Sequence, residues 1–145
     1  MSIMVCDLLK TKGYEVLSIT PYSSVFEALQ LLAEKNVGAL LVLQSGKLAG
    51  IFSERDYARK LVLKGKFSKN TEVSEVMTEN VVTVEPEDNI EYCMGLMTNK
   101  RIRHLPVMKE GCVIGVISIG DIVKAIIADQ RSTIGLLEEY ITGGR

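Results

Sequence analysis

The sequence is poor in the residues that most often build catalytic and metal centres. It contains one histidine, His104, three cysteines and no tryptophan. The cysteines, Cys6, Cys93 and Cys112, are odd in number and form no C-x-x-C pair, so neither a disulfide framework nor a zinc site is indicated. This usage is typical of a reducing, intracellular environment. We expect no metal and no catalytic cofactor, and we expect Cys93 and Cys112 to be buried thiols.

An excess of one charge and long apolar runs are also missing. The 17 Lys and Arg residues nearly balance the 18 Asp and Glu residues, which leaves a formal net charge of −1. This balance gives no electrostatic reason to expect nucleic acid or an anionic membrane as the main partner. The apolar runs are far shorter than the roughly 20 residues that span a bilayer, and Asp7 and Lys10 interrupt any signal-peptide core. We therefore expect a soluble, cytoplasmic protein.

One heptapeptide pattern occurs twice. GIFSERD occupies 50–56 and GVISIGD occupies 115–121, and both read Gly, two apolar residues, Ser, two variable residues, Asp. The same offset of 65 positions relates Pro21 to Pro86, Lys35 to Lys100 and Gly46 to Gly111. A single offset that holds without a gap indicates an internal duplication. Further upstream the offset becomes 68, since VCDLL at 5–9 matches VSEVM at 73–77.

The first copy predicts a β-α-β-β-α unit. A short strand around Ser18 precedes Ser23 and Ser24, which are good N-caps for a helix that runs to about residue 36. Two short apolar runs, ALLVLQ and LAGIFS, flank the turn residues SGK and predict a hairpin. A second helix then begins at ERD and ends at Gly65.

The second copy repeats this order. We predict a helix over 88–99, strands over 104–108 and 112–117, and a helix over 119–129. Because sheets this small are not stable alone, we predict an α+β fold in which the two repeats pack as a pseudo-twofold pair. The predicted organisation is listed in chain order: first repeat 5–65, polar and exposed linker 66–72, second repeat 73–130, and a tail over 131–145 that is helical through Tyr140 and frayed beyond it.

The heptapeptide has a purely structural interpretation. Ser-x-x-Asp before a helix is the spacing of a capping box, with Ser53 and Ser118 as N-caps and Asp56 and Asp121 at the third helical position. Such caps stabilise the helix whether or not anything binds near them.

The same residues also suit a ribonucleotide. A helix that begins after a strand presents free N–H groups, and these bind phosphate well. The Ser hydroxyl can join them, and an Asp carboxylate can accept hydrogen bonds from both hydroxyls of a ribose. Gly50 and Gly115 would let a base or backbone approach closely.

With these motifs the chain resembles a tandem pair of cystathionine-β-synthase (CBS) domains, the regulatory pair called a Bateman module. The resemblance covers about residues 5–130 and rests on the two G-h-h-S-x-x-D stretches, on LSITP and VTVEP, and on RIRHLPV at 101–107. It implies two nucleotide clefts lined by both repeats. Members of the family bind AMP, ADP, ATP, NAD(H) or S-adenosylmethionine there, and many form dimers.

The resemblance also implies roles for particular residues. Asp56 and Asp121 would hold ribose, and Ser53 and Ser118 would help to hold phosphate or ribose. Arg103 and His104 lie where such modules place basic residues that contact phosphate. The residues expected to line the base are Ser18, Ile19, Thr83 and Val84.

The two copies differ at these positions. Arg103 and His104 correspond to Gly38 and Ala39 in the first copy, and Arg55 corresponds to Gly120 in the second. The clefts are therefore chemically unequal, and we expect one well-formed site and one weaker or empty site. The sequence does not assign the basic pair to either cleft.

We predict a stand-alone regulatory, energy-sensing module rather than an enzyme. It would bind an adenine nucleotide, AMP first among the candidates, form a homodimer, and signal to an effector protein by a change of conformation. Two alternatives remain open. One is a ligand-free dimerisation scaffold in which Ser-x-x-Asp is only a helix cap, and the other is a small nucleotide hydrolase or transferase, for which no residue set is visible.

Overall fold

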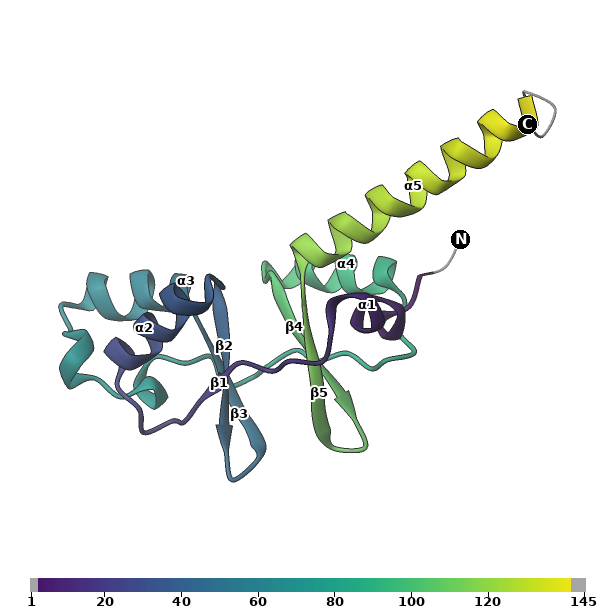
Figure 1. The fold of residues 1–145 in the computed structure, drawn as a ribbon. Coiled ribbons are helices and arrows are strands. Elements are labelled where there is room, and N and C mark those ends of the chain that lie inside the picture. Colours follow the sequence, from purple (N-terminus) through teal and green to yellow (C-terminus); the bar gives the residue numbers. More distant parts are fainter. Residues whose placement is uncertain (1–2, 142–145) are drawn as a thin grey trace.

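Two copies of one helix-and-hairpin unit lie side by side in the molecule (Figure 1). The computed structural model describes residues 3–141, of which 132–134 and 136–141 are described by their backbone alone. The predicted α+β architecture and the order of helix, hairpin and helix are confirmed in both repeats. The first repeat contains β1 (Ser18–Ile19), α2 (Val25–Lys35), β2 (Ala39–Gln44), β3 (Lys47–Ser53) and α3 (Glu54–Asp56). The second contains α4 (Ile90–Lys100), β4 (His104–Lys109), β5 (Cys112–Ser118) and α5 (Ile119–Ile141).

The hairpins and helix ends of the two repeats match closely. Ser24 and Asn89 cap α2 and α4 by accepting hydrogen bonds from the N–H groups of Glu27 and Tyr92. Both helices end in a left-handed residue, Asn36 at φ 53° and Arg101 at φ 56°. Both hairpins are antiparallel and carry a register shift at the same place, after Val42 and after Val107. The internal duplication therefore extends to the backbone conformation.

The first strand differs between the repeats. In the first repeat β1 pairs in parallel with β2, with Ser18 opposite Leu41. In the second repeat the corresponding segment makes a single parallel bridge between Val84 and Val107. The sheets consequently have three strands and two strands.

The last helix also differs. In the first repeat the predicted helix over 54–64 is interrupted, because α3 passes into a π-helical turn, η1 (Tyr57–Leu61), and then into a 3₁₀ turn, η2 (Val62–Lys64). Gly65 ends it at φ 70°, as predicted. In the second repeat α5 continues without a break and projects from the body (Figure 1), so the predicted tail helix is part of α5. The predicted frayed end, 142–145, lies outside the described residues.

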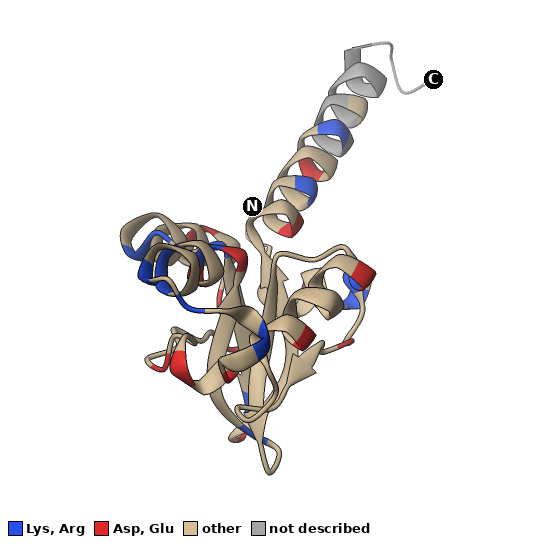
Figure 2. Ribbon diagram, turned by 90° about the vertical axis from the view of Figure 1, so that its left-hand side faces the viewer, with Lys and Arg blue, Asp and Glu red and all other residues tan. Residues whose placement is uncertain are grey.

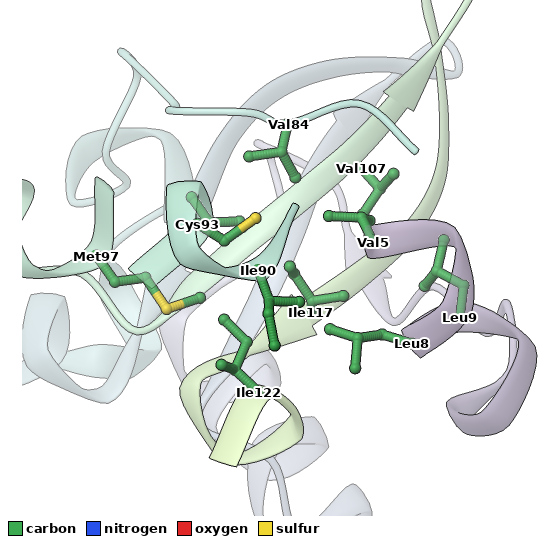
Figure 3. Close-up of a cluster of buried hydrophobic side chains, with 11 residues drawn as sticks. Val5, Leu8, Leu9, Val84, Ile90, Cys93, Met97, Val107, Ile117 and Ile122 are labelled. Atoms are coloured by element: carbon green, nitrogen blue, oxygen red, sulfur yellow. The ribbon is translucent and has the colours of Figure 1, made fainter. Parts of the chain in front are cut away.

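The leading segment of each repeat packs in the hydrophobic core of the other repeat. The helix α1 (Val5–Lys12) packs on the second repeat, where Val5, Leu8 and Leu9 complete a cluster around Ile117 (Figure 3). The matching segment of the second repeat, which begins with the 3₁₀ turn η4 (Val73–Glu75), places Val73 and Val76 in the first core. This exchange ties the repeats together, since neither hydrophobic core is complete without the other half of the chain.

The heptapeptide glycines allow this exchange. A Cβ atom on Gly115 would lie 2.7 Å from Cδ2 of Leu9, and one on Gly50 would lie 2.8 Å from both Sδ of Met77 and the carbonyl oxygen of Thr78. At these glycines the leading segments make the close approach that the sequence predicted for a base or backbone.

The predicted linker 66–72 is exposed at five of its seven positions, and two residues, Thr71 and Cys112, depart from the exposure predicted for them. Thr71 of the predicted exposed linker is 5% exposed, because its carbonyl accepts a hydrogen bond from the N–H of Val25 and its hydroxyl donates to the carbonyl of Phe67. Cys93 is buried as predicted, whereas Cys112 is exposed because it begins β5 beside the hairpin turn. No helix within residues 3–141 is long and apolar enough to cross a membrane.

Candidate functional site

Two open clefts lie between the repeats, one at each heptapeptide aspartate. The Asp121 cleft has a volume of about 660 Å³ and the Asp56 cleft a volume of about 920 Å³. Both repeats line each of them, and Gly38, Ala39, Ile51 and His104 border both. The two clefts therefore meet at His104.

Asp121 is held in an ionised state at the start of α5. The N–H of Ser118 donates to its Oδ2 over 2.8 Å, while its own N–H donates to the Ser118 hydroxyl over 3.2 Å. These bonds form the predicted capping box. The ammonium of Lys12 lies 2.6 Å from the same Oδ2 and also donates to the carbonyl of Val116. Burial acts to raise the pKa of Asp121, but the bonds from Lys12 and Ser118 outweigh it and lower the pKa below its ordinary value.

Asp56 is more completely occupied by its own neighbours. Its Oδ2 accepts hydrogen bonds from the N–H and the hydroxyl of Ser53, which is the second predicted capping box. Its Oδ1 accepts a hydrogen bond from the Thr78 hydroxyl and lies 3.2 Å from the ammonium of Lys60. The side chain of Asp56 is 10% exposed, compared with 18% for Asp121. Asp121 is therefore the more exposed of the two carboxylates.

His104 is a neutral side chain between the clefts. Its pKa is lowered from the ordinary value of 6.5, first by burial and then by the positive charge of Lys12, against the opposing effect of Asp121. At neutral pH its imidazole therefore has one N–H donor and one acceptor nitrogen. Its ring lies against Gly38, where a Cβ atom would be 3.5 Å from Cε1. A methyl group at position 38 would thus lie in ordinary van der Waals contact with this ring.

Both members of the predicted basic pair line the Asp56 cleft, and one of them lines the Asp121 cleft as well. Arg103 lines the Asp56 cleft, whereas His104 lines both clefts. Arg55 lines the Asp56 cleft as well, and its guanidinium donates over 2.6 Å to the carbonyl of Arg101 at the end of α4. The structure thus resolves which cleft Arg103 faces, a question that the sequence left open.

The four predicted base-lining residues border neither cleft. Val84 is buried in the core, and Ile19 packs against the other core. Ser18 and Thr83 are exposed. The adjacent positions, Leu17 in the Asp121 cleft and Val82 in the Asp56 cleft, line the walls instead.

Sequence reasoning missed both lysines that bind the aspartates. Lys60 follows Asp56 by four positions, which is the helical spacing that brings such side chains together, so it was recognisable. Lys12 is 109 positions from Asp121, and only the exchange of the leading helix brings it there. Thr78 is also supplied by the exchanged segment of the other repeat.

Two exchanged β-α-β-β-α repeats with a cleft at each Ser-x-x-Asp define a tandem-repeat module. The model of the CBS domain family matches residues 5–63 and again residues 73–128. The chain belongs to the CBS domain family, and the resemblance seen in the sequence is confirmed.

The relatives share the whole pair of repeats. The mitochondrial CBS domain-containing protein CBSX3 of Arabidopsis thaliana is 41% identical over 152 residues, with 99% of this chain and 74% of the relative covered. The crystal structure of the CBS domain protein NE2398 is 48% identical, with a TM-score of 0.85 over 88% of this chain and 99% of that one. The CBS domain pair of protein MJ0100, in complex with 5′-methylthioadenosine and S-adenosyl-L-methionine, is 25% identical, with a TM-score of 0.75 over 86% and 99%.

Proposed function

We propose that this chain is a regulatory module that binds an adenine nucleotide or a related adenosine compound in the Asp121 cleft. The observation that carries the proposal is the state of Asp121, an ionised and partly exposed carboxylate in a cleft that both repeats line. An ionised carboxylate accepts hydrogen bonds from both ribose hydroxyls. The ligand would share this carboxylate with Lys12, which already donates to Oδ2.

The remaining walls of the Asp121 cleft suit the other parts of such a ligand. Leu17, Val37 and Leu41 provide an apolar surface for a flat base. Lys35 and Lys124 provide positive charge for a phosphate, and neutral His104 provides one donor and one acceptor. Ser118 is engaged in the capping box, so its hydroxyl would contact the ligand only as a secondary partner. The complex of the MJ0100 pair with two adenosine compounds supports the choice of ligand class.

We propose that the module acts by changing the angle between its repeats and not by catalysis. The Lys12–Asp121 ion pair joins a helix of the first repeat to a helix of the second, so a ligand that competes for Asp121 acts on a contact between the halves. A ligand shifts such an equilibrium only by its difference in affinity for the two states. An effector protein and a homodimeric assembly are part of the same proposal.

A cytoplasmic location remains the prediction from composition, and cell fractionation distinguishes it from the mitochondrial location in the name of the Arabidopsis relative.

The scaffold alternative is favoured by one observation. Both aspartates take part in capping boxes and ion pairs with groups of the protein, so stability alone accounts for Ser-x-x-Asp. On this alternative, Asp121→Asn costs about 1 kcal/mol of stability, as loss of a cap does, and no small molecule changes the unfolding temperature.

Thermal unfolding tests the proposal directly. The wild type, Asp121→Asn and Asp56→Asn are heated with AMP, ADP, ATP, NADH or S-adenosylmethionine. A ligand at a hundred times its dissociation constant adds about 2.7 kcal/mol, which raises the Tm by roughly 5–10 °C for a chain of this size. We expect such a rise for an adenine compound, and we expect Asp121→Asn to reduce it more than Asp56→Asn does. No rise with any of the five compounds supports the scaffold, and turnover of a compound on incubation supports an enzyme.

A further inference from the structure

The end of the first repeat and the linker after it carry a concentrated positive charge. Residues 57–71 contain five Lys and Arg residues and no Asp or Glu, a formal charge of +5 in a chain whose net charge is −1. The matching stretch of the second repeat, 122–136, has two basic residues and one acidic residue. Figure 2 shows the molecule from the side of the first repeat, with Lys and Arg gathered on helical turns at the left of the view. The balanced composition of the whole chain therefore conceals a basic segment that only one repeat has.

The most exposed large apolar side chains among those described lie in the same segment. Leu63 is 79% exposed and Phe67 is 73% exposed, and Val62 is exposed beside them. At the offset of 65, Leu63 and Phe67 correspond to Ala128 and Ser132. The fold that the repeats share therefore does not require large apolar side chains at these two positions.

The backbone holds this segment at both ends and exposes it between them. Leu61 is buried in the first core, and the helix that contains it ends at Gly65 after the 3₁₀ turn η2. Thr71 is buried at the other end, where its hydroxyl donates to the carbonyl of Phe67. Eight of the nine residues over 62–70 are exposed. The apolar side chains thus lie on a fixed turn at the surface.

Exposed lysines border the apolar side chains on this turn. Nζ of Lys69 lies 5.0 Å from the centroid of the Phe26 ring, which brings an exposed aromatic side chain of α2 beside the turn. Lys66 lies 3.8 Å from the carboxylate of Glu75, a weak contact because both side chains are exposed. The turn therefore presents one patch, the tip patch, which consists of Val62, Leu63, Lys64, Lys66, Phe67 and Lys69.

We infer that the tip patch is a docking site for the surface of an anionic lipid membrane. Such a surface attracts lysine side chains, while Leu and Phe side chains enter the boundary between the headgroups and the acyl chains. The tip patch complements the membrane in both respects, because it places cations around protruding apolar groups. The inference goes beyond the proposed function, since neither cleft takes part in it.

Other occupants fit the tip patch less well. A second copy of the chain in a twofold pair would bring the patch against itself, and its lysines would repel one another. A nucleic acid would attract the lysines, but Val62 and Leu63 have no ring on which a base could stack. Both occupants are outcomes of the test.

Flotation with lipid vesicles tests the inference on the full chain. The vesicles consist of phosphatidylcholine, with or without phosphatidylserine, and the bound fraction of the protein is measured against lipid concentration. We expect binding only to the vesicles that contain phosphatidylserine. This binding should weaken as the salt concentration rises, because salt screens the charges.

The lysines are tested with a charge-matched pair of variants. A lysine near an anionic surface contributes roughly fivefold in affinity, so Lys64→Gln/Lys69→Gln should weaken binding at least tenfold. Lys64→Arg/Lys69→Arg keeps both charges and should bind as the wild type does. The control Lys47→Gln/Lys109→Gln removes two charges from the hairpin ends, where both side chains are exposed, and should also bind as the wild type does.

The apolar side chains are tested without any change of charge. Leu63→Ser/Phe67→Ser should weaken binding about tenfold or more, because neither side chain then enters the lipid. Both positions are exposed, so this variant should unfold at the temperature of the wild type. The control Tyr14→Ser/Tyr92→Ser removes two other exposed aromatic side chains, which are 57% and 52% exposed. It should bind the vesicles as the wild type does.

Four results would overturn the inference. The first is equal binding to both kinds of vesicle, or no binding to either. The second is binding that Leu63→Ser/Phe67→Ser leaves unchanged, since it would reduce the contact to general charge attraction. The third is release of the protein by soluble glycerophosphoserine at constant ionic strength, or tighter binding of an RNA oligonucleotide through Lys64 and Lys69. The fourth is a dimer in sedimentation equilibrium that Leu63→Ser/Phe67→Ser dissociates, which would assign the tip patch to a second copy.

Discussion

Lys12 and Asp121 form an ion pair that joins the leading helix of the first repeat to the last helix of the second, with Nζ 2.6 Å from Oδ2. Lys12 is also the largest charge effect on the neighbouring His104, whose pKa it lowers. The charges of Lys12, Asp121 and His104 are therefore linked, and a change at one of them is visible at the others.

The variant Lys12→Met should raise the pKa of both His104 and Asp121, because it removes a positive charge that opposes the imidazolium and stabilises the carboxylate. The cost in stability should be about 0.2–1 kcal/mol, as for other partly exposed ion pairs. Since His104 is the only histidine, one ring resonance followed by NMR against pH reports its pKa without assignment. Lys10→Met, an exposed change on the same helix, is the control and should leave this pKa in place. An unchanged pKa in Lys12→Met would show that the ion pair does not persist in solution.

The free energy of unfolding should decrease as the pH falls below about 6.5. The pKa of His104 is lower in the folded protein than its ordinary value of 6.5, so the unfolded chain takes up this proton first and gains stability relative to the folded chain. The stability that neutral His104 contributes is complete above the pKa of the unfolded chain. It is lost as the pH falls from that value to the lower pKa of the folded protein. Asp121 acts in the same direction at lower pH, because its pKa is also lowered and its contribution is lost as the pH falls through that folded value. Urea unfolding between about pH 5 and 8 measures the slope, and His104→Gln should flatten it in the lower part of this range, below about pH 6.5.

Much of the fold was predictable because short stretches of sequence determine its caps and turns, and the duplication repeats these stretches in both halves. Ser24 as an N-cap, the hairpin turn at Ser45 and Gly46, and the capping box at Ser53 all follow from side chains within a few positions of one another. The exchange of the leading segments was not predictable in the same way, since nothing near Leu9 indicates that it packs on Gly115.

The candidate site was predictable only in part for the same reason. The sequence locates Asp56 and Asp121 at helix starts, but the lysine bound to Asp121 comes from the far end of the chain. Of the residues expected to line the base in the extended segments before Pro21 and Pro86, Val84 is buried in the second core. Which side of an extended segment faces a cleft depends on packing that the short β1 segment does not reveal.

The cysteines should differ strongly in reactivity towards a thiol reagent such as DTNB. Cys112 is exposed and should react at once, whereas Cys93 is buried and its pKa is raised to about 11, chiefly by burial. A thiol with so high a pKa contains almost no reactive thiolate at neutral pH. Labelling of Cys112→Ser and Cys93→Ser, followed by mass spectrometry, identifies each reacting residue. Rapid labelling of Cys93 under native conditions would contradict the packing of the second core.

Substitution of the heptapeptide glycines should destabilise the protein by unequal amounts. At Gly115 a new methyl group meets the flexible end of Leu9, which can shift, whereas at Gly50 it meets the carbonyl oxygen of Thr78 at 2.8 Å. That carbonyl already accepts a hydrogen bond from the N–H of Ile51, so it cannot move without losing the bond. Overpacking typically costs about 1–3 kcal/mol of stability. We expect Gly50→Ala to lose more stability than Gly115→Ala.

The matched control for both substitutions is Gly95→Ala within α4. A Cβ atom there meets nothing within 4 Å, and alanine is favoured over glycine in a helix by about 1 kcal/mol. Urea unfolding should therefore show that Gly95→Ala is more stable than the wild type while the two heptapeptide variants are less stable. Gly50→Ala and Gly115→Ala variants as stable as the wild type would show that the leading segments do not lie against the heptapeptides. That result would contradict the exchange of leading segments that brings Lys12 to Asp121.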